Sequence, residues 1–130
     1  MARIEVPVSA GELVDKLTIL EIKSERIDDA AKLANVRREL AGLTAIVGPL
    51  LAANEALAAL KSSLRTVNET LWQIEDDIRD FERRKDFGPS FVALARGVYR
   101  NNDKRAALKR EIDKLLGSEL TEEKSYQAYD

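Results

Sequence analysis

A repeat of apolar residues in the middle of the chain restricts it to folds built from long helices. Its members recur at alternating spacings of three and four: Leu57, Leu60, Leu64, Val67, Leu71, Ile74, Ile78 and Phe81. This spacing places all of them on one side of an α-helix and is the pattern of a left-handed supercoil. Such a helix needs a partner helix beside it, so the sequence predicts an all-α fold with a coiled-coil-like hairpin.

The composition supports this fold class. Ala, Leu, Glu, Lys and Arg, the residues with good helix propensity, dominate the sequence. Aromatic residues make up only 5% and there are three prolines, which is unlike a β-sandwich or barrel. With 130 residues, of which 45% are apolar, we expect one domain (1–130) with a buried core.

Capping signals predict where the helices begin and end. Ser9 and Glu12 have the spacing of a capping box, and Asp29 suits the N-cap of a second helix. Gly48-Pro49 favours the end of one helix and the start of the next, and Gly117 favours a final stop. The predicted helices cover residues 10–27, 30–47, 49–84 and 90–116.

The remaining residues form two terminal segments. Residues 1–8 alternate apolar and polar residues and are expected to form an extended arm, which Pro7 would limit to an edge strand. Residues 118–130 form an acidic tail with Tyr126 and Tyr129 as weak anchors. Short connections make neighbouring helices antiparallel. The predicted architecture is therefore an antiparallel bundle of four helices in which 49–84 and 90–116 form one long hairpin.

This arrangement leaves part of the apolar repeat uncovered. A turn at Gly48-Pro49 would let the second helix cover the third only as far as Val67, so residues 71–81 would have only the fourth helix beside them. Exposed apolar stripes favour a further covering surface. The expected cover is a second copy of the chain around a two-fold axis. The alternative is that the arm, the first helix or the tail folds over it.

Two charge runs lie near this stripe. Glu75-Asp76-Asp77 is acidic and Arg83-Arg84-Lys85 is basic. Runs of this kind are most often solvated helix faces, but their opposite signs would also suit a contact in which one run meets the other in a dimer. The expected partner is a second copy, with another protein as the alternative.

A polar layer interrupts the apolar pattern where the third and fourth helices face each other. Its members come together in an antiparallel register with Arg105 opposite Glu69: Asn68, Trp72, Glu75, Arg79, Tyr99, Asn102, Arg105 and Lys109. The favoured interpretation is a structural network, because a desolvated arginine needs a carboxylate partner and polar core residues fix helix register. The alternative is a ligand site in which Arg105 and Lys109 hold an anion.

The chain lacks the residue types that several classes of protein function require. The chain has no Cys and no His, which removes disulfides, thiol nucleophiles, Ser-His triads and the usual transition-metal ligands. We therefore expect no catalytic residues, metal or cofactor. The formal net charge of −2 argues against a nucleic-acid partner. Because no signal peptide and no apolar stretch long enough for a membrane span is visible, a cytoplasmic location is expected.

Four segments have a familiar sequence: residues 11–23, Lys85-Asp86-Phe87-Gly88, Tyr99-Arg100-Asn101-Asn102-Asp103-Lys104-Arg105 and Gly117-Ser118-Glu119-Leu120. With these segments the chain resembles, over nearly its whole length, a family of short, all-helical bacterial proteins of unknown function. A second uncharacterised helical family shares a looser pattern of Asn68, Trp72, Glu75 and Asp76 with Asn102, Asp103, Arg105 and Lys109. The resemblance implies that the polar layer belongs together, and an association with genes for cell-surface polysaccharide and lipopolysaccharide synthesis.

Two function hypotheses follow. The leading one is a non-enzymatic, self-associating helical protein that acts as an interaction or accessory scaffold protein. The alternative is a small enzyme or a binder of an anionic metabolite, such as a sugar phosphate or nucleotide sugar, with the polar layer as its site.

Overall fold

Four helices make up most of the computed structural model, which describes residues 2–129. They are α1 (Ala10–Arg26), α2 (Ala30–Ala53), α3 (Glu55–Arg83) and α4 (Pro89–Leu116). The described residues contain no strand. The predicted all-α class is confirmed, and α3 and α4 pack against each other more extensively than any other pair.

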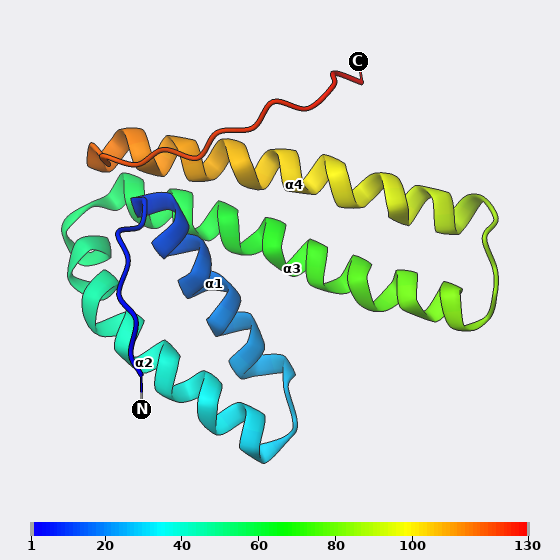
Figure 1. The fold of residues 1–130 in the computed structure, drawn as a ribbon, viewed down its shortest axis with the longest axis horizontal. Helices are drawn as coiled ribbons and strands as arrows, with labels where there is room; N and C mark the ends of the chain where they lie inside the picture. Colours follow the sequence, from blue (N-terminus) through cyan, green and yellow to red (C-terminus); the bar gives the residue numbers. More distant parts are fainter. Residues whose placement is uncertain (1, 130) are drawn as a thin grey trace.

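The helices form two hairpins that cross at one end of the molecule. The α3–α4 hairpin is long and antiparallel, and the α1–α2 hairpin lies obliquely across the end where α3 begins and α4 finishes (Figure 1). α1 contacts all three other helices, whereas α2 contacts α1 and α3 but not α4. The opposite end of the α3–α4 hairpin projects beyond the crossing (Figure 1). α1 therefore makes most of the contacts between the two hairpins.

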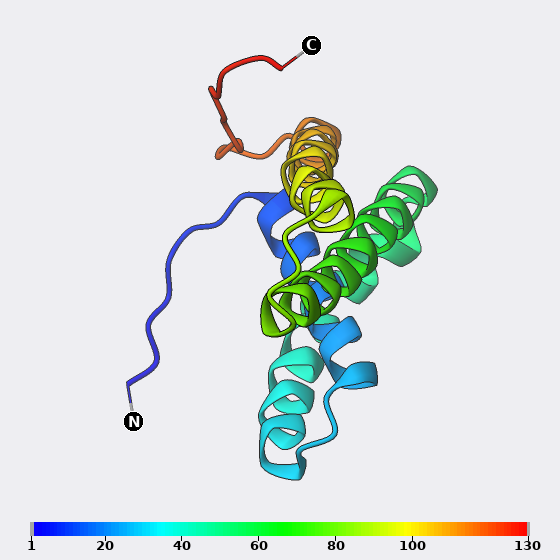
Figure 2. The same ribbon diagram turned by 90° about the vertical axis from the view of Figure 1, so that its right-hand side faces the viewer.

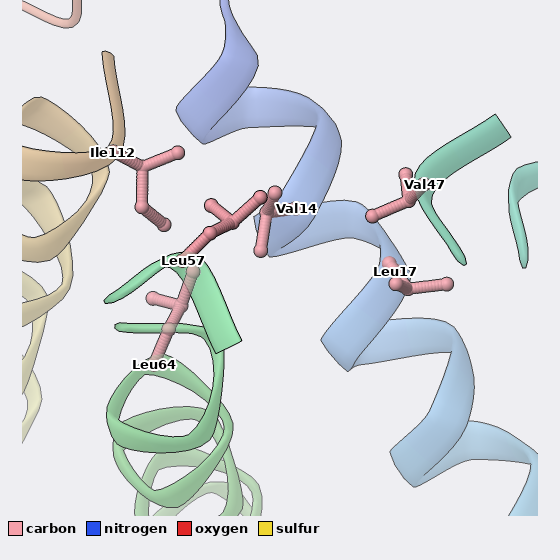
Figure 3. Packing of buried hydrophobic residues seen from close by; sticks show 6 residues of the cluster. All are labelled: Val14, Leu17, Val47, Leu57, Leu64 and Ile112. Atoms are coloured by element: carbon pink, nitrogen blue, oxygen red, sulfur yellow. The ribbon is translucent and has the colours of Figure 1, made fainter. Parts of the chain in front are cut away.

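The buried core lies at this crossing and draws on every helix. Its fully buried apolar side chains converge from α1, α2, α3 and α4 (Figure 3): Val14, Leu17, Val47, Leu57, Leu64 and Ile112. Two of these, Leu57 and Leu64, belong to the apolar repeat that predicted the long helix. The first half of the repeat therefore packs in the core shared by all four helices, and the second half packs between α3 and α4.

Most of the predicted capping signals are confirmed. The Ser9 hydroxyl accepts a hydrogen bond from the Glu12 amide at 3.1 Å, and the Asp29 carboxylate accepts one from the Lys32 amide at 2.8 Å. Gly117 ends α4 with φ at 61°, in the left-handed region that favours glycine.

The predicted helix break at Gly48-Pro49 is wrong. α2 continues through both residues to Ala53, and α3 begins at Glu55. Val47 is fully buried and Leu51, one turn later, packs against the same core, so burial on both sides of Pro49 keeps the helix going. The break comes at Asn54, whose side chain accepts from the Leu57 amide at 3.1 Å. Core packing outweighs the missing proline donor here.

α1 also reaches further along α3 than the sequence predicted. Ile19 and Ile22 lie beside Leu71 and Trp72, and the Arg26 guanidinium donates to the Gln73 side chain at 3.4 Å. The part of the hairpin that only α3 and α4 share therefore begins near residue 75 rather than at 71.

The terminal segments follow the prediction only in part. Residues 2–8 form no strand, their apolar side chains are exposed, and the arm leaves the bundle (Figure 2). In the tail, the Tyr129 ring packs edge-on against Tyr99 with centroids 5.1 Å apart, as an anchor should. Tyr126 remains 81% exposed and is not an anchor. No described helix is long and apolar enough to cross a membrane.

A close approach of α1 to α4 depends on one glycine. A Cβ atom at Gly11 would lie 2.3 Å from the Lys109 carbonyl oxygen and 2.9 Å from Asp113 Oδ1. At Gly42, on the exposed side of α2, an added Cβ would meet nothing within 4 Å. Alanine at position 11 would therefore clash with α4, whereas alanine at position 42 would change only the helix propensity.

We expect Gly11→Ala to lower the free energy of unfolding by about 1–3 kcal/mol, because backbone must move to admit the methyl group. The matched control, Gly42→Ala, should be neutral or raise it by up to about 1 kcal/mol. Denaturant unfolding of the two variants measures both effects, and equal stability of the two would show that the close crossing is absent.

Candidate functional site

A buried carboxylate lies at the centre of the polar residues. Asp15, on α1, is only 1% exposed. Its Oδ1 accepts from Arg105 Nε at 2.9 Å and its Oδ2 from Arg105 Nη2 at 2.5 Å, so the pair is bidentate. Asn68 Nδ2 also donates to Asp15 Oδ1 at 2.9 Å. One carboxylate thus binds side chains from α3 and α4 at the same time.

Asn68 and Thr18 complete the network around this carboxylate. Asn68 Nδ2 donates to Thr18 Oγ1 at 2.8 Å, and the Thr18 hydroxyl donates to the Asp15 carbonyl oxygen at 2.7 Å. No fully buried side-chain nitrogen or oxygen of the described residues lacks a hydrogen-bond partner. A buried polar network that is fully satisfied stabilises one arrangement of its helices.

Lys109 extends the network towards the surface. Its ammonium lies 2.6 Å from Glu12 Oε2, 3.4 Å from Glu122 Oε2 and 4.0 Å from Asp15 Oδ2, and its side chain is only 7% exposed. Glu12 therefore gives its backbone amide to the Ser9 cap and its carboxylate to Lys109. We call Glu12, Asp15, Thr18, Asn68, Arg105 and Lys109 the Asp15 cluster.

The two cations of the cluster hold their protons more tightly than usual. The hydrogen bond to Asp15 is the main cause that raises the pKa of Arg105, assisted by the charge of the same carboxylate and opposed by burial. Burial alone would lower the pKa of Lys109. The hydrogen bond to Glu12 and the charges of Asp15, Glu12 and Glu122 outweigh it, and the pKa is raised.

Next to the cluster, the end of α4 caps the beginning of α1. Asp113 Oδ1 accepts from the Gly11 amide at 2.6 Å, and Ser118 Oγ accepts from the Ala10 amide at 3.2 Å. The second Asp113 oxygen accepts from the Glu122 amide at 3.1 Å, which holds the tail against α4. A carboxylate at a helix N-terminus is favourable, and here it also joins helices that are distant in sequence.

The structure divides the predicted polar layer into three parts. Asn68, Arg105 and Lys109 belong to the Asp15 cluster. Trp72, Glu75 and Asn102, together with Asn68 and Arg105, line a hollow of about 310 Å³ that we call the Trp72 hollow. Arg79 and Tyr99 lie outside both.

The last two residues make contacts of other kinds. Arg79 is exposed and pairs with Glu75 one turn earlier on α3. Tyr99 packs against Tyr129 of the tail. Neither side chain contributes to the cluster.

The carboxylate that binds Arg105 lies on α1, not on α3 as predicted. The antiparallel register placed Glu69 opposite it, but Glu69 binds Arg65 at 2.9 Å. The sequence did contain a signal for the true partner, because Asp15 and Thr18 share the buried face of α1 with Val14 and Leu17. Asp113 gave a weaker signal, as an acidic residue directly after the core residue Ile112.

The charged groups of the cluster are already engaged with one another. Asp15 binds both Arg105 and Asn68, and Lys109 is surrounded by three carboxylates. No group of three or more acidic side chains among residues 2–129 is arranged to hold a metal ion. The geometry therefore supports the interpretation of the cluster as a structural network.

Comparison with known proteins adds a family to this description. Residues 4–129 match the model of DUF6165, a family of unknown function. The chain belongs to this family. The match includes all four helices, the arm from Ile4 and the tail to Tyr129, so the DUF6165 region contains both the Asp15 cluster and the Trp72 hollow. No curated protein and no solved structure matches the chain.

We expect Asp15→Ala to lower the free energy of unfolding by about 3–5 kcal/mol, because it leaves Arg105 without its buried partner. The control Asp28→Ala removes an exposed carboxylate between α1 and α2 and should change stability by no more than about 0.5 kcal/mol. Thermal and denaturant unfolding measure both. A small effect at Asp15 would mean that the pair adds nothing to the fold.

The raised pKa of Lys109 also predicts how stability depends on pH. Because the folded-state pKa lies above the unfolded value of about 10.4, the charge stabilises the fold at lower pH, and this contribution is lost as pH rises through the folded-state pKa. Wild type should therefore lose more stability than Lys109→Met between about pH 9 and pH 11.5. If wild type and Lys109→Met lose the same free energy of unfolding over this pH range in denaturant titrations, the prediction is contradicted.

Proposed function

We propose that this DUF6165 protein is a non-enzymatic helical interaction protein that acts as a self-associating scaffold. The observation that carries the proposal is a self-complementary surface at the free end of the α3–α4 hairpin, which we call the tip face. It surrounds a hollow of about 480 Å³ lined by Asp77, Asp80, Phe81 and Arg84 of α3 and by Ser90, Ala93 and Leu94 of α4.

The tip face has an apolar centre and a charged rim. Phe81 and Leu94 are half-buried, and neither α1 nor α2 reaches this part of the hairpin (Figure 1). The packing of α3 on α4 therefore leaves part of each of these side chains in contact with water. A further helical surface would remove the remaining apolar area from water, at a gain of about 25 cal/mol per Å².

The charges on α3 are arranged so that the face would match itself. Asp77 and Arg84 are seven residues apart, and Asp80 and Phe81 lie between them on the same side of the helix. If a second copy packs antiparallel around a two-fold axis between residues 80 and 81, each Asp77 meets Arg84 of the other copy. Two-fold symmetry makes each contact occur twice, because if residue i of one copy contacts residue j of the other, residue j of the first copy also contacts residue i of the second.

These two side chains are also free to make such pairs. Among the described residues, neither Asp77 nor Arg84 forms a salt bridge, since the ion pairs at this end join Arg83 to Asp80 and Lys85 to Glu82. The Asp77 carboxylate accepts a hydrogen bond from the side-chain amide of Gln73, and the Arg84 guanidinium lies 4.4 Å from the centre of the Phe81 ring. An intermolecular pair would therefore displace no ion pair within the chain.

The alternative, binding of an anionic metabolite by the polar layer, has less support. An anion at Arg105 would compete with the bidentate Asp15 carboxylate, and one at Lys109 would enter a group of three carboxylates. Neither cation is free to neutralise a phosphate.

Charge reversal tests the proposal. Asp77→Lys and Arg84→Glu should each abolish the dimer, because like charges would then meet at both symmetry-related contacts. The double variant should restore it with the pairs exchanged. Light scattering or sedimentation at high micromolar concentration measures the mass, which should be about twice the chain mass of 14.5 kDa for wild type and for the double variant.

Arg37→Glu, an exposed charge reversal on α2, serves as the control and should remain dimeric. A wild-type protein that stays at 14.5 kDa under these conditions would refute self-association. A dimer that survives both single reversals would place the interface elsewhere on the molecule.

A further inference from the structure

We propose that the Trp72 hollow binds an uncharged, polyhydroxylated ring of the size of one hexose. This inference does not depend on self-association, because the hollow lies between the α1 crossing and the tip face. Three helices form it, and its volume of about 310 Å³ lies at the lower end of the range found for small-molecule sites.

Half of the residues that line the hollow are apolar. Ile19 and Ile22 of α1 and Leu71 and Trp72 of α3 line it. The broad indole ring and the aliphatic side chains offer a surface against which the C–H face of a sugar ring can pack. Sites for small ligands combine a surface of this kind with a few polar groups that fix the orientation.

Asn68 supplies a hydrogen-bond acceptor in a fixed orientation. Its amide nitrogen donates to Asp15 Oδ1 at 2.9 Å and to Thr18 Oγ1 at 2.8 Å, so both N–H groups are engaged. The carbonyl oxygen is then the atom of this amide that remains for a ligand. The Asp15 cluster holds it in place before binding, which lowers the entropic cost of forming a complex.

Arg105 and Asn102 supply further groups from α4. Arg105 uses one N–H each of Nε and Nη2 for Asp15, which leaves the two N–H groups of Nη1 and the second one of Nη2 as donors. The half-buried side-chain amide of Asn102 forms no hydrogen bond with any described residue and offers both a donor and an acceptor. Donors and acceptors therefore occur together among the residues that line the hollow.

The charges around the hollow indicate an uncharged ligand. Arg105 is neutralised by Asp15, and Glu75 is paired with Arg79. A phosphate or carboxylate would find no free cation. A hydroxyl group, in contrast, both donates and accepts, so the hydroxyls of one ring can match the mixed set formed by Asn68, Asn102, Glu75 and Arg105.

The chain carries a built-in reporter for this site. Trp72 is its single tryptophan and lines the hollow, so fluorescence excited selectively at tryptophan responds to a ligand bound there. The probes are the methyl glycosides of glucose, galactose, mannose and N-acetylglucosamine, with inorganic phosphate and adenine as comparison ligands. We expect a saturable change in emission with at least one glycoside and none with phosphate or adenine.

Asn102→Ala should weaken glycoside binding about tenfold, which is the loss expected for one or two neutral hydrogen bonds. Its melting temperature should remain that of wild type, because Asn102 makes no hydrogen bond within the Asp15 cluster. The control is the adjacent Asn101→Ala, since Asn101 donates to the Gly97 carbonyl at 2.8 Å and does not line the hollow. It should bind as wild type does.

Three results would overturn the proposal. The first is the absence of a saturable response to every glycoside up to its solubility limit. The second is saturable binding of phosphate or adenine in place of the glycosides. The third is glycoside binding that is equally strong in Asn102→Ala, which would put the ligand somewhere other than this hollow.

Discussion

The fold depends on a carboxylate that is buried where three helices meet. An ionised group 1% exposed is costly unless its charge and its lone pairs are matched. Asp15 is matched by the bidentate Arg105 and by the Asn68 amide, at distances between 2.5 and 2.9 Å. Because these partners come from α4 and α3, the carboxylate is satisfied in only one arrangement of α1 on the hairpin. Apolar packing alone would tolerate several such arrangements, whereas a buried charge with two directional partners excludes the others.

The remaining features follow from the position that this interaction gives to α1. At its first turn, α1 crosses α4 so closely that only glycine fits at position 11, and the Asp113 carboxylate caps the buried Gly11 amide. Further along, Ile19 and Ile22 line the Trp72 hollow together with residues of α3 and α4. α1 then ends, and the last part of the hairpin projects with only its own two helices to cover it (Figure 1). The same helix position thus creates the core, the hollow and the uncovered tip face.

Much of the fold could be predicted because its signals are local. The three-four repeat identified α3, and Ser9, Asp29 and Gly117 marked helix ends through their own chemistry. The grouping of Asn68, Arg105 and Lys109 followed from antiparallel register, which a short turn fixes. The partner of Arg105 did not follow, because the angle of α1 across the hairpin is decided by packing between distant residues. The same holds for Pro49, where burial of Val47 and Leu51 carries α2 past a residue that usually ends a helix.

We expect Asp15 and Arg105 to stabilise the fold as a coupled pair. A double-mutant cycle with Asp15→Asn, Arg105→Gln and the combined variant measures that coupling most directly, with free energies of unfolding taken from denaturant titration. We expect the double variant to be more stable than the sum of the single losses implies, by a coupling energy of at least about 1 kcal/mol. Losses that add to within about 0.5 kcal/mol would contradict the claim, because they would show that the two side chains act independently.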